Sequence, residues 1–201
     1  MNQRKKQPHQ TRQTILDAAG AEFSLRGYTG AGLGGIVARA ELTKGALFHH
    51  FSDKRTLAMA WIGERLGEEM LRLWVTPLQP AHSLDDLRDL CRVRCREMHA
   101  EEATSALVAI AAEVAACDEM LAGALDAVFR LWREAVVGFF ERGKAAGWIH
   151  PSIKPESEAA LLVSAFSGFT VAVKCAATPE SRAAFLSGIE GYLETLRVAT
   201  H

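Results

Sequence analysis

Helical periodicity is the feature that most constrains how this chain can fold. Apolar residues recur three and four positions apart in almost every segment, and β-branched residues never alternate with polar ones over the length of a strand. The six prolines lie in the breaks between the periodic segments, and residues 76–82, with two of them, read as a connector. We therefore expect an all-α protein. Its helices, about nine in number, should cover residues 11–26, 33–40, 44–50, 53–74, 83–99, 104–116, 118–147, 155–177 and 178 to near the end.

Residue types at several expected helix ends agree with this division. Gly27 follows the first helix, where a left-handed residue ends a helix with little strain. Thr43, and Ser83 with Asp86 three residues later, are typical of helix starts because their side chains accept hydrogen bonds from free amides. Pro155 suits the first turn of a helix.

Charge is unevenly distributed along a nearly neutral chain. Lys and Arg number 23 and Asp and Glu 24, which excludes a wholly basic histone-like protein and a wholly acidic one. Residues 1–60 carry nine basic and four acidic side chains, a net charge of +5, and the remainder carries −6. A basic head on an acidic body indicates that one end contacts a polyanion.

The residue pattern favours a cytoplasmic location. The basic residues Arg4, Lys5 and Lys6 are not followed by the apolar stretch of a signal peptide. The longest apolar run, residues 161–177, is interrupted by polar residues and is shorter than the roughly 20 apolar residues of a membrane span. We expect the four cysteines to be reduced thiols.

Two short helices, 33–40 and 44–50, separated by three residues, are typical of a helix-turn-helix, whose second helix can enter the DNA major groove. Thr43 can cap that helix and reach a phosphate, and Lys44 can meet phosphate or a base edge. Gly45 permits close approach of the backbone, while His49 and His50 extend the same surface.

A basic arm precedes this segment. Arg4, Lys5 and Lys6, with Arg12, can follow the phosphate backbone or enter a minor groove. Spacing alone leaves a second interpretation open, in which the segment is a compact three-helix substructure with a solvated charged face.

Residues 11–61 resemble the N-terminal domain of the TetR family of transcriptional regulators. The matching pieces are ILDAA…F…RGY in the first helix, IVA in the second, TKGALFHHF across the third, and DKRTL after it. The resemblance implies a homodimer that binds a palindromic operator and releases it when a small molecule enters the C-terminal domain. It also implies a division into a DNA-binding part, 1–54, and an effector-binding and dimerisation part, 55–201, the latter resembling the family more loosely.

The resemblance carries DNA-facing roles to six positions. They are Thr43, Lys44, Gly45, Phe48, His49 and Lys54.

The chain departs from the family pattern at several places. Phe48 stands where a tyrosine is usual, so a hydroxyl contact to phosphate is lost. Ala31 and Gly32 replace a helix-capping Thr or Ser, a loss that Thr29 partly offsets, and Glu41 adds negative charge in the turn. These departures suggest modest affinity or an unusual operator.

Residues 30–35 also satisfy the pattern GxGxxG of dinucleotide-binding proteins. That site requires a preceding strand, whereas an amphipathic helix precedes it here. Glycine weakens helices, so we interpret the run as a second helix that is frayed when free and orders on DNA.

The C-terminal part contains no recognisable catalytic motif, and we expect no enzymatic activity, cofactor or metal. Large aromatic residues in helices that resemble the family's ligand-binding bundle favour a cavity for an apolar or aromatic ligand, with ordinary core packing as the alternative. The candidate lining residues are Met70, Trp74, Cys91, Cys95, Met98, Val108, Phe129, Trp132 and Phe166.

Cys91 and Cys95 lie on one helix face among three arginines, and a cationic neighbour lowers the pKa of a thiol. His99, one turn further on, could extend the row towards a soft metal or an electrophile. The alternative is a pair of plain buried cysteines. Where related electrophile sensors often carry a cysteine, this chain has Ser105, which weakens the sensing hypothesis.

The last two helices combine small residues with an apolar stripe. In the family such a pair forms a four-helix interface with a second copy, whereas the stripe could instead close the core of the monomer. The candidate interface residues are Phe166, Thr170, Val173, Phe185, Ile189, Tyr192 and Leu196.

Taken together, these features predict a dimeric, ligand-responsive DNA-binding regulator, most simply a repressor. The alternative is a helical ligand-binding or adaptor protein that has lost specific DNA recognition.

Overall fold

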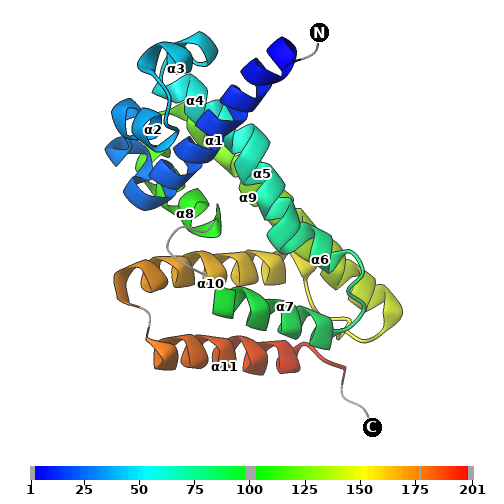
Figure 1. Ribbon diagram of the computed structural model, residues 1–201. Helices are drawn as coiled ribbons and strands as arrows, with labels where there is room; N and C mark the ends of the chain where they lie inside the picture. Colours follow the sequence, from blue (N-terminus) through cyan, green and yellow to red (C-terminus); the bar gives the residue numbers. More distant parts are fainter. Residues whose placement is uncertain (1–2, 98–102, 177, 199–201) are drawn as a thin grey trace. The chain divides into compact units, whose positions relative to one another are not determined.

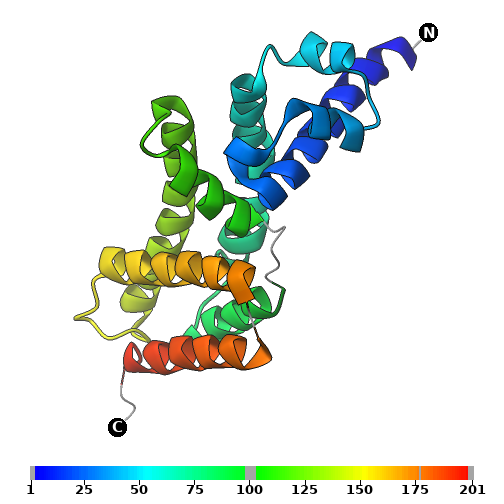
Figure 2. The same cartoon turned by 90° about the vertical axis from the view of Figure 1, so that its left-hand side faces the viewer.

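The computed structural model describes residues 3–97, 103–176 and 178–198, which form helices joined by short turns (Figures 1 and 2). They pack as two compact units, Met1–Glu69 with Glu101–Val128 (unit 1) and Met70–Ala100 with Phe129–His201 (unit 2). The expected all-α fold is confirmed. Within the described ranges there are nine continuous helical stretches, and the β-type pairing is limited to one bridge between Ile149 and Arg197.

Unit 1 holds the helices of its two segments, residues 1–69 and 101–128. They are α1 (Gln3–Gly30), α2 (Leu33–Arg39), α3 (Lys44–His50), α4 (Lys54–Trp61), the π-helical turn η1 (Ile62–Leu66), α8 (Ala103–Val114) and the start of α9 (Glu119–Ala146). The short helix α5 (Gly67–Met70) spans the boundary. Unit 2 holds the π-helical turn η2 (Leu71–Val75), α6 (Thr76–Leu78), α7 (Leu84–Glu97), the rest of α9, α10 (Pro155–Ala176) and α11 (Pro179–Thr195).

Two helices are longer than expected. Helix α1 begins at Gln3 rather than at residue 11, because its polar first residues are mostly good helix formers that need no apolar stripe to continue the helix. Helix continues through Pro77, where we expected a connector. The preceding π-helical turn, η2, shifts the hydrogen-bond register by one residue, which accommodates a proline that has no N–H to donate.

The helical stretch from α4 to α6 buries a residue at every fourth position. Ile62, Leu66, Met70, Trp74 and Leu78 are each at most 1% exposed. The turns η1 and η2 lie inside this stretch, and each accommodates one residue more than an α-helical turn.

The core of unit 1 forms on the predicted face of α1. Ile15, Leu16, Ala19 and Phe23 are all buried, and the ring of Phe23 lies 5.4 Å from that of Trp61 on α4. Helix α1 packs against α2, α4 and α8, so it is the central element of this unit.

The end of α1 is built around Gly27. Its backbone has φ 70° and ψ 178°, a conformation that is essentially restricted to glycine. The Glu113 carboxylate from α8 occupies the space where a Cβ atom of residue 27 would lie, and Glu113 Oε2 accepts a hydrogen bond from the Thr29 amide at 2.6 Å. The predicted helix end at Gly27 is therefore correct, and one further turn, Tyr28–Gly30, follows the kink.

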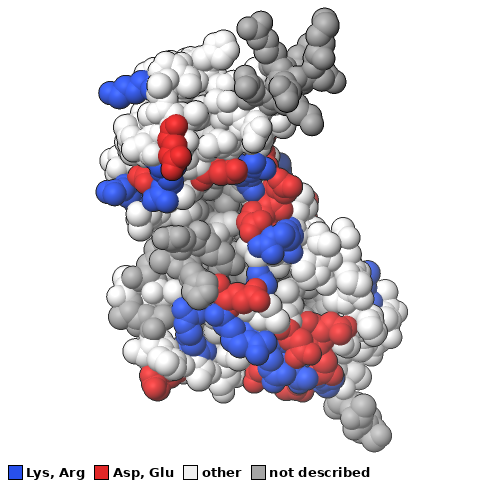
Figure 3. Space-filling model, viewed as in Figure 1, with Lys and Arg blue, Asp and Glu red and all other residues white. Residues whose placement is uncertain are grey.

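Unit 2 is organised around α7, α10 and α11, which Figures 1 and 2 show side by side. Ion pairs join α7 to α11: Arg92 Nε lies 2.6 Å from Glu190, and Arg197 bridges Asp85 at 3.1 Å and Glu194 at 3.0 Å. Basic and acidic side chains accordingly alternate on the surface there (Figure 3).

Helix α10 is apolar on both sides. Residues Pro155–Val173 have the length and composition of a membrane-spanning helix, which core helices of soluble proteins also have. One side of α10 buries Leu162, Phe166 and Phe169 in unit 2. Its other side is exposed and carries no charge from Ala160 to Ala172, whereas Glu156 near its start is exposed and charged.

We predict that Gly27→Ala destabilises the protein by about 2 kcal/mol or more, because a side chain there is strained by the positive φ and collides with Glu113. Chemical denaturation measures the effect. Gly123→Ala in α9 is the matched control, since nothing lies within 4 Å of its Cβ position; it should stabilise by about 0.5–1 kcal/mol. Equal effects of the two substitutions would contradict the prediction.

Candidate DNA-binding surface and effector-binding core

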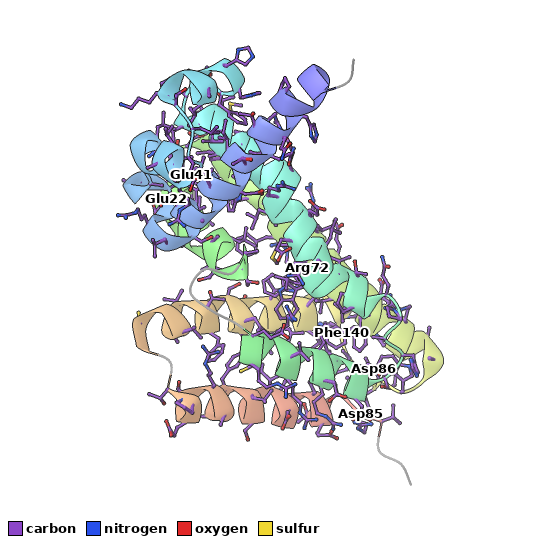
Figure 4. The ribbon with its side chains drawn as sticks, viewed as in Figure 1. Glu22, Glu41, Arg72, Asp85, Asp86 and Phe140 are labelled. Carbon is purple, nitrogen blue, oxygen red and sulfur yellow. The ribbon has the colours of Figure 1, made fainter. Side chains whose placement is uncertain are left out.

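A tight turn joins α2 to α3. The Glu41 amide donates to Ala38 O at 3.2 Å and the Leu42 amide donates to Val37 O at 3.1 Å. Glu41 has φ 54°, and among the described residues it is the one non-glycine residue with a positive φ. Figure 4 labels Glu41 in this turn, which sets the direction in which α3 leaves α2.

Thr43 caps α3 as predicted, because its hydroxyl accepts a hydrogen bond from the Ala46 amide at 3.1 Å. Leu47 anchors the helix in the core and is 1% exposed. The opposite face of α3 is accessible to solvent. Its exposed residues are Thr43, Lys44, Gly45, Phe48 and His49.

The start of α2 has the weakness that the sequence suggested. Gly32 occupies the capping position and provides no side-chain hydrogen bond to the helix. Helix α2 is held instead by buried Glu22 on α1, whose carboxylate lies 3.0 Å from Nε of both Arg26 and Arg39. Gly35 leaves room for this carboxylate, since a Cβ atom there would lie 3.0 Å from Glu22 Oε2. The glycine run thus belongs to a helix–helix contact rather than to a phosphate-binding loop.

The basic residues expected at the DNA divide into two groups. Lys44 is exposed, whereas the Lys54 ammonium donates to Tyr28 O at 2.8 Å and Ala31 O at 3.1 Å and lies over the Tyr28 ring. Arg12 forms two 2.5 Å hydrogen bonds with Glu64. The Arg4, Lys5 and Lys6 positions fall within α1, but their side chains lie outside the described residues.

His50 is half-buried beside His49. Burial, with smaller contributions from the charges of His49 and Arg12, lowers the pKa of His50 below its usual value, so this imidazole is neutral at pH 7. Thr29 is exposed, with its amide already bound to Glu113.

Three of the expected effector residues form one aromatic cluster in unit 2. The Trp74 ring lies 4.6 Å from that of Trp132 and 4.8 Å from that of Phe166. The indole N–H of Trp132 is buried and has no hydrogen-bond partner among the described residues, which leaves one polar group to satisfy in an apolar core.

The other candidates are dispersed. Met70, Cys91 and Cys95 are buried in unit 2, Val108 belongs to unit 1, and Met98 and His99 lie outside the described residues.

Phe129 lines a groove of about 590 Å³ between α9 and α10. The other lining residues, which the sequence did not single out, are Arg133, Ala160, Val163, Ser164 and Ser167. The pairs 129/133, 160/164 and 163/167 are each four apart, so helical spacing was the signal that could have found them. Unit 1 has a hollow of about 640 Å³ beside Asp17, Trp61 and Arg65.

Burial outweighs the nearby arginines at the cysteine pair. Desolvation raises the pKa of Cys91 far above that of a free thiol, and it raises the pKa of Cys95 as well. The arginines are paired with acids, Arg92 with Glu190 at 2.6 Å and Arg94 with Glu97 at 2.5 Å. The expectation of a lowered thiol pKa is therefore wrong, because the sequence shows which residues are adjacent but not how deeply the sulfur atoms are buried. No metal-ligand cluster is present within the described ranges.

The predicted interface stripe faces the inside of unit 2. Phe166, Thr170, Ile189 and Leu196 are buried, and Phe185 stacks on Phe169 with ring centroids 4.0 Å apart. Val173 and Tyr192 are half-buried, and the Tyr192 hydroxyl donates to Glu158. The middle parts of the same two helices expose small and apolar residues. They include Ala160, Leu161, Ser164, Gly168, Val171 and Ala172 of α10, and Ala184, Ser187, Gly188 and Gly191 of α11. The exposed acids Glu156, Glu180 and Glu194 lie towards the helix ends.

Comparison with known proteins finds similarity to bacterial regulators. Residues 15–60 match the family described as bacterial regulatory proteins, tetR family. The chain is 29% identical over 166 residues to the A-factor receptor protein of Streptomyces griseus, covering 79% of this chain and 53% of that protein. It is 43% identical over 53 residues to the HTH-type transcriptional regulator AcrR of Shigella flexneri, covering 26% of this chain and 25% of that one. The chain thus spans about half the length of the first relative and a quarter of the second.

The fold is shared with solved structures. The crystal structure of a TetR transcriptional regulator from Chloroflexus aurantiacus superimposes with a TM-score of 0.85 at 23% identity, covering 96% of this chain and all (100%) of the other.

We predict that only the exposed thiols react quickly in the folded protein. Cys117 and Cys175 are exposed, whereas the raised pKa values of Cys91 and Cys95 keep these two thiols protonated at neutral pH. A thiol-disulfide titration should count two groups in buffer and four in denaturant, and Cys175→Ser should lower both counts by one. A third fast thiol at pH 7 would contradict the burial argument. Raising the pH should accelerate the buried thiols only above the range in which a free cysteine ionises.

We predict that Glu41→Gly raises the free energy of unfolding by about 0.5–1 kcal/mol. Relief of the positive φ exceeds the extra chain entropy of glycine. Glu41→Ala is the matched control, because it removes the charge but retains the strain. If Ala and Gly stabilised the protein equally in thermal denaturation, charge rather than backbone conformation would be the cause.

Proposed function

Because the chain belongs to the TetR family of bacterial regulators, we propose that it is a sequence-specific DNA-binding transcriptional regulator that responds to a small molecule. The observation that carries this proposal is the exposed face of α3. It presents a cation, a glycine and two ring side chains on a helix that is anchored by Leu47 and capped by Thr43. Residues 1–54 supply the DNA contacts, and residues 55–201 supply effector binding and dimerisation.

Lys44 is the residue best placed to contact DNA. It lies in the first turn of α3, is exposed, and makes no ion pair within the described ranges. A cation there can reach phosphate or the N7 and O6 atoms of guanine. Thr43, Gly45, Phe48 and His49 complete the contact surface, and the arm at Arg4, Lys5 and Lys6 adds phosphate contacts. Lys54 contributes by holding residues 28–31 in place, and Thr29 lies beside that linker.

We place the effector at the aromatic cluster of unit 2. Trp74, Trp132 and Phe166 supply apolar and aromatic surface, and the unpaired Trp132 N–H can donate to an acceptor atom of the ligand. The binding of ligand and the binding of DNA would then be coupled by a single free energy. Each therefore weakens the binding of the other by the same factor. The protein acts as a repressor in the cytoplasm, and this function requires no catalytic group or cofactor.

The homodimer interface is placed on the exposed faces of α10 and α11. The exposed positions between Ala160 and Ala172 and between Ala184 and Gly191 are small or apolar and carry no charge, which suits close packing of helices from a second copy. The half-buried residues Val173, Phe185 and Tyr192 border this surface, whereas Phe166, Thr170, Ile189 and Leu196 support it from inside.

An adaptor that has lost specific DNA recognition is the alternative function. The uncapped start of α2 at Gly32 and the strained acidic turn at Glu41 favour it, because both weaken the DNA-binding segment. Selection of DNA distinguishes the two functions.

We predict that random duplex DNA selected on the purified protein yields a palindrome. The affinity for that palindrome should fall steeply with salt, because the basic residues displace counterions from phosphate. Lys44→Ala should weaken binding about tenfold or more, as expected for loss of a base contact of about 1–3 kcal/mol per half-site. Lys154→Ala in unit 2 is the control and should bind normally. Failure to enrich any sequence, with only weak binding, would favour the adaptor.

We predict a dimer in sedimentation at micromolar concentration, and that Gly188→Glu dissociates it. The substitution places a charge in the uncharged middle part of the exposed α11 surface, where nothing within 4 Å in the monomer opposes a larger side chain. Gly123→Glu, equally unobstructed but on α9, should remain dimeric. A monomeric parent protein would contradict the placement of the interface.

A further inference from the structure

We propose that Phe48 recognises the C5-methyl group of a pyrimidine in the DNA major groove, so that the operator carries thymine, or 5-methylcytosine in its place, at one defined position of each half-site. This inference rests on the proposed DNA-binding function and adds the chemical group that is read at that position.

Phe48 differs from every other aromatic residue of unit 1 in its exposure. Its side chain is 51% exposed, whereas Phe51, three residues later, is 2% exposed and packs in the core. Among the described Phe, Tyr and Trp residues, Phe48 is the one that is exposed rather than half-buried or buried. It does not contribute to the core of this chain, so its apolar surface is free to contact a partner.

The surroundings of Phe48 point to a polyanion with an isolated apolar group. Its exposed neighbours on α3 are Lys44, Gly45 and His49, which are cationic, small or polar, and do not extend its apolar surface into a protein-docking patch. The segment 1–60 has a net charge of +5. In the major groove the apolar group that side chains contact is the methyl group of thymine, and 5-methylcytosine presents its methyl at the same position of the pyrimidine ring.

The chemistry of phenylalanine narrows the contact further. The side chain has no hydroxyl and cannot donate to a phosphate oxygen or a base, so apolar contact is the one favourable interaction that it can make in the groove. Burying one methyl group contributes about 0.8 kcal/mol, a factor of about three to five in affinity.

Helix geometry predicts where the methyl group lies. Lys44 and Phe48 are four residues apart, hence on the same side of α3 and about 6 Å apart along its axis. Base pairs are stacked about 3.4 Å apart, and α3 would lie along the inclined major groove, so the two contacts should lie at most about two base pairs from each other.

Uracil substitution in the selected operator tests the proposal without altering the protein. Each thymine is replaced in turn by uracil, which lacks only the methyl group, and affinity is measured for the parent protein. We expect affinity to fall about three- to fivefold per half-site at one thymine, within about two base pairs of the position at which Lys44→Ala relaxes specificity. In two further operators, that thymine is replaced by cytosine or by 5-methylcytosine. The parent protein should bind the 5-methylcytosine operator more tightly than the cytosine operator by the same factor.

Protein variants assign the effect to Phe48. Phe48→Ala should bind the thymine operator more weakly than the parent protein by the same factor, and it should bind the thymine and uracil operators with equal affinity. Phe48→Leu should retain part of the preference for thymine. Lys44→Ala should bind more weakly but keep the full preference for thymine. Because Phe48 is exposed, these variants should unfold at the temperature of the parent protein.

The outcomes separate this proposal from the proposed function. A tightly bound palindrome that tolerates uracil at every position overturns the role of Phe48 but leaves the DNA-binding function intact. A preference for thymine that persists in Phe48→Ala also overturns it, because another residue then reads the methyl group. Absence of any enriched sequence overturns both.

Discussion

The hydrogen bond between the Glu113 carboxylate and the Thr29 amide organises the part of this protein to which we assign DNA binding. It is possible only because Gly27 has no side chain and adopts a backbone conformation that other residues avoid. The same linker is held from its carbonyl side by Lys54, whose ammonium donates to Tyr28 and Ala31. With its amide and carbonyl groups both engaged, the linker sets where α2 begins, and α2 in turn determines where α3 presents its exposed face.

Acidic side chains of α8 and of the turn before α9 thus contact the proposed DNA-binding segment and the helix that follows it. Besides Glu113, Asp118 accepts a hydrogen bond from Arg55 on α4 at 2.9 Å while capping α9 through the Leu121 amide at 3.1 Å. An exposed ion pair contributes little to stability by itself. Its position matters more, since the residue that begins α9 is also a contact of the helix that follows α3.

The sequence predicted those parts of the structure that follow from local chemistry. The nine helices, the caps at Thr43 and Ser83, and the buried face of α1 follow from periodicity and side-chain hydrogen bonding within four residues. The exposed face of α3 could likewise be predicted, because a short helix with one anchoring leucine leaves its other positions exposed to solvent.

The failures have a common origin in contacts between residues far apart in sequence. The cysteine row suggested lowered pKa values because neighbouring arginines are visible in the sequence, whereas burial and the pairing of Arg92 with Glu190 are not. Likewise, the apolar stripe of α11 could face its own core or a second copy, and only the packing of Phe185 on Phe169 decides where that ring lies. The carbonyl partners of Lys54 lie 23 and 26 residues away and were equally invisible, while the DNA-facing role that the resemblance gives to Lys54 stays a prediction.

The two π-helical turns between Ile62 and Val75 have a consequence for tracing the ancestry of this chain. In a regular α-helix, side chains four residues apart drift by about 40° per step, so an unbroken series of fourth-position residues would spiral away from the core. The wider turns η1 and η2 absorb that drift, which is how Ile62, Trp74 and Leu78 are all buried. Against a relative whose corresponding helix is regular, a gapless alignment would match core positions here with surface positions there. One-residue gaps at the π-helical turns would restore the correspondence, and evolutionary profiles built without them would misassign the residues on both sides.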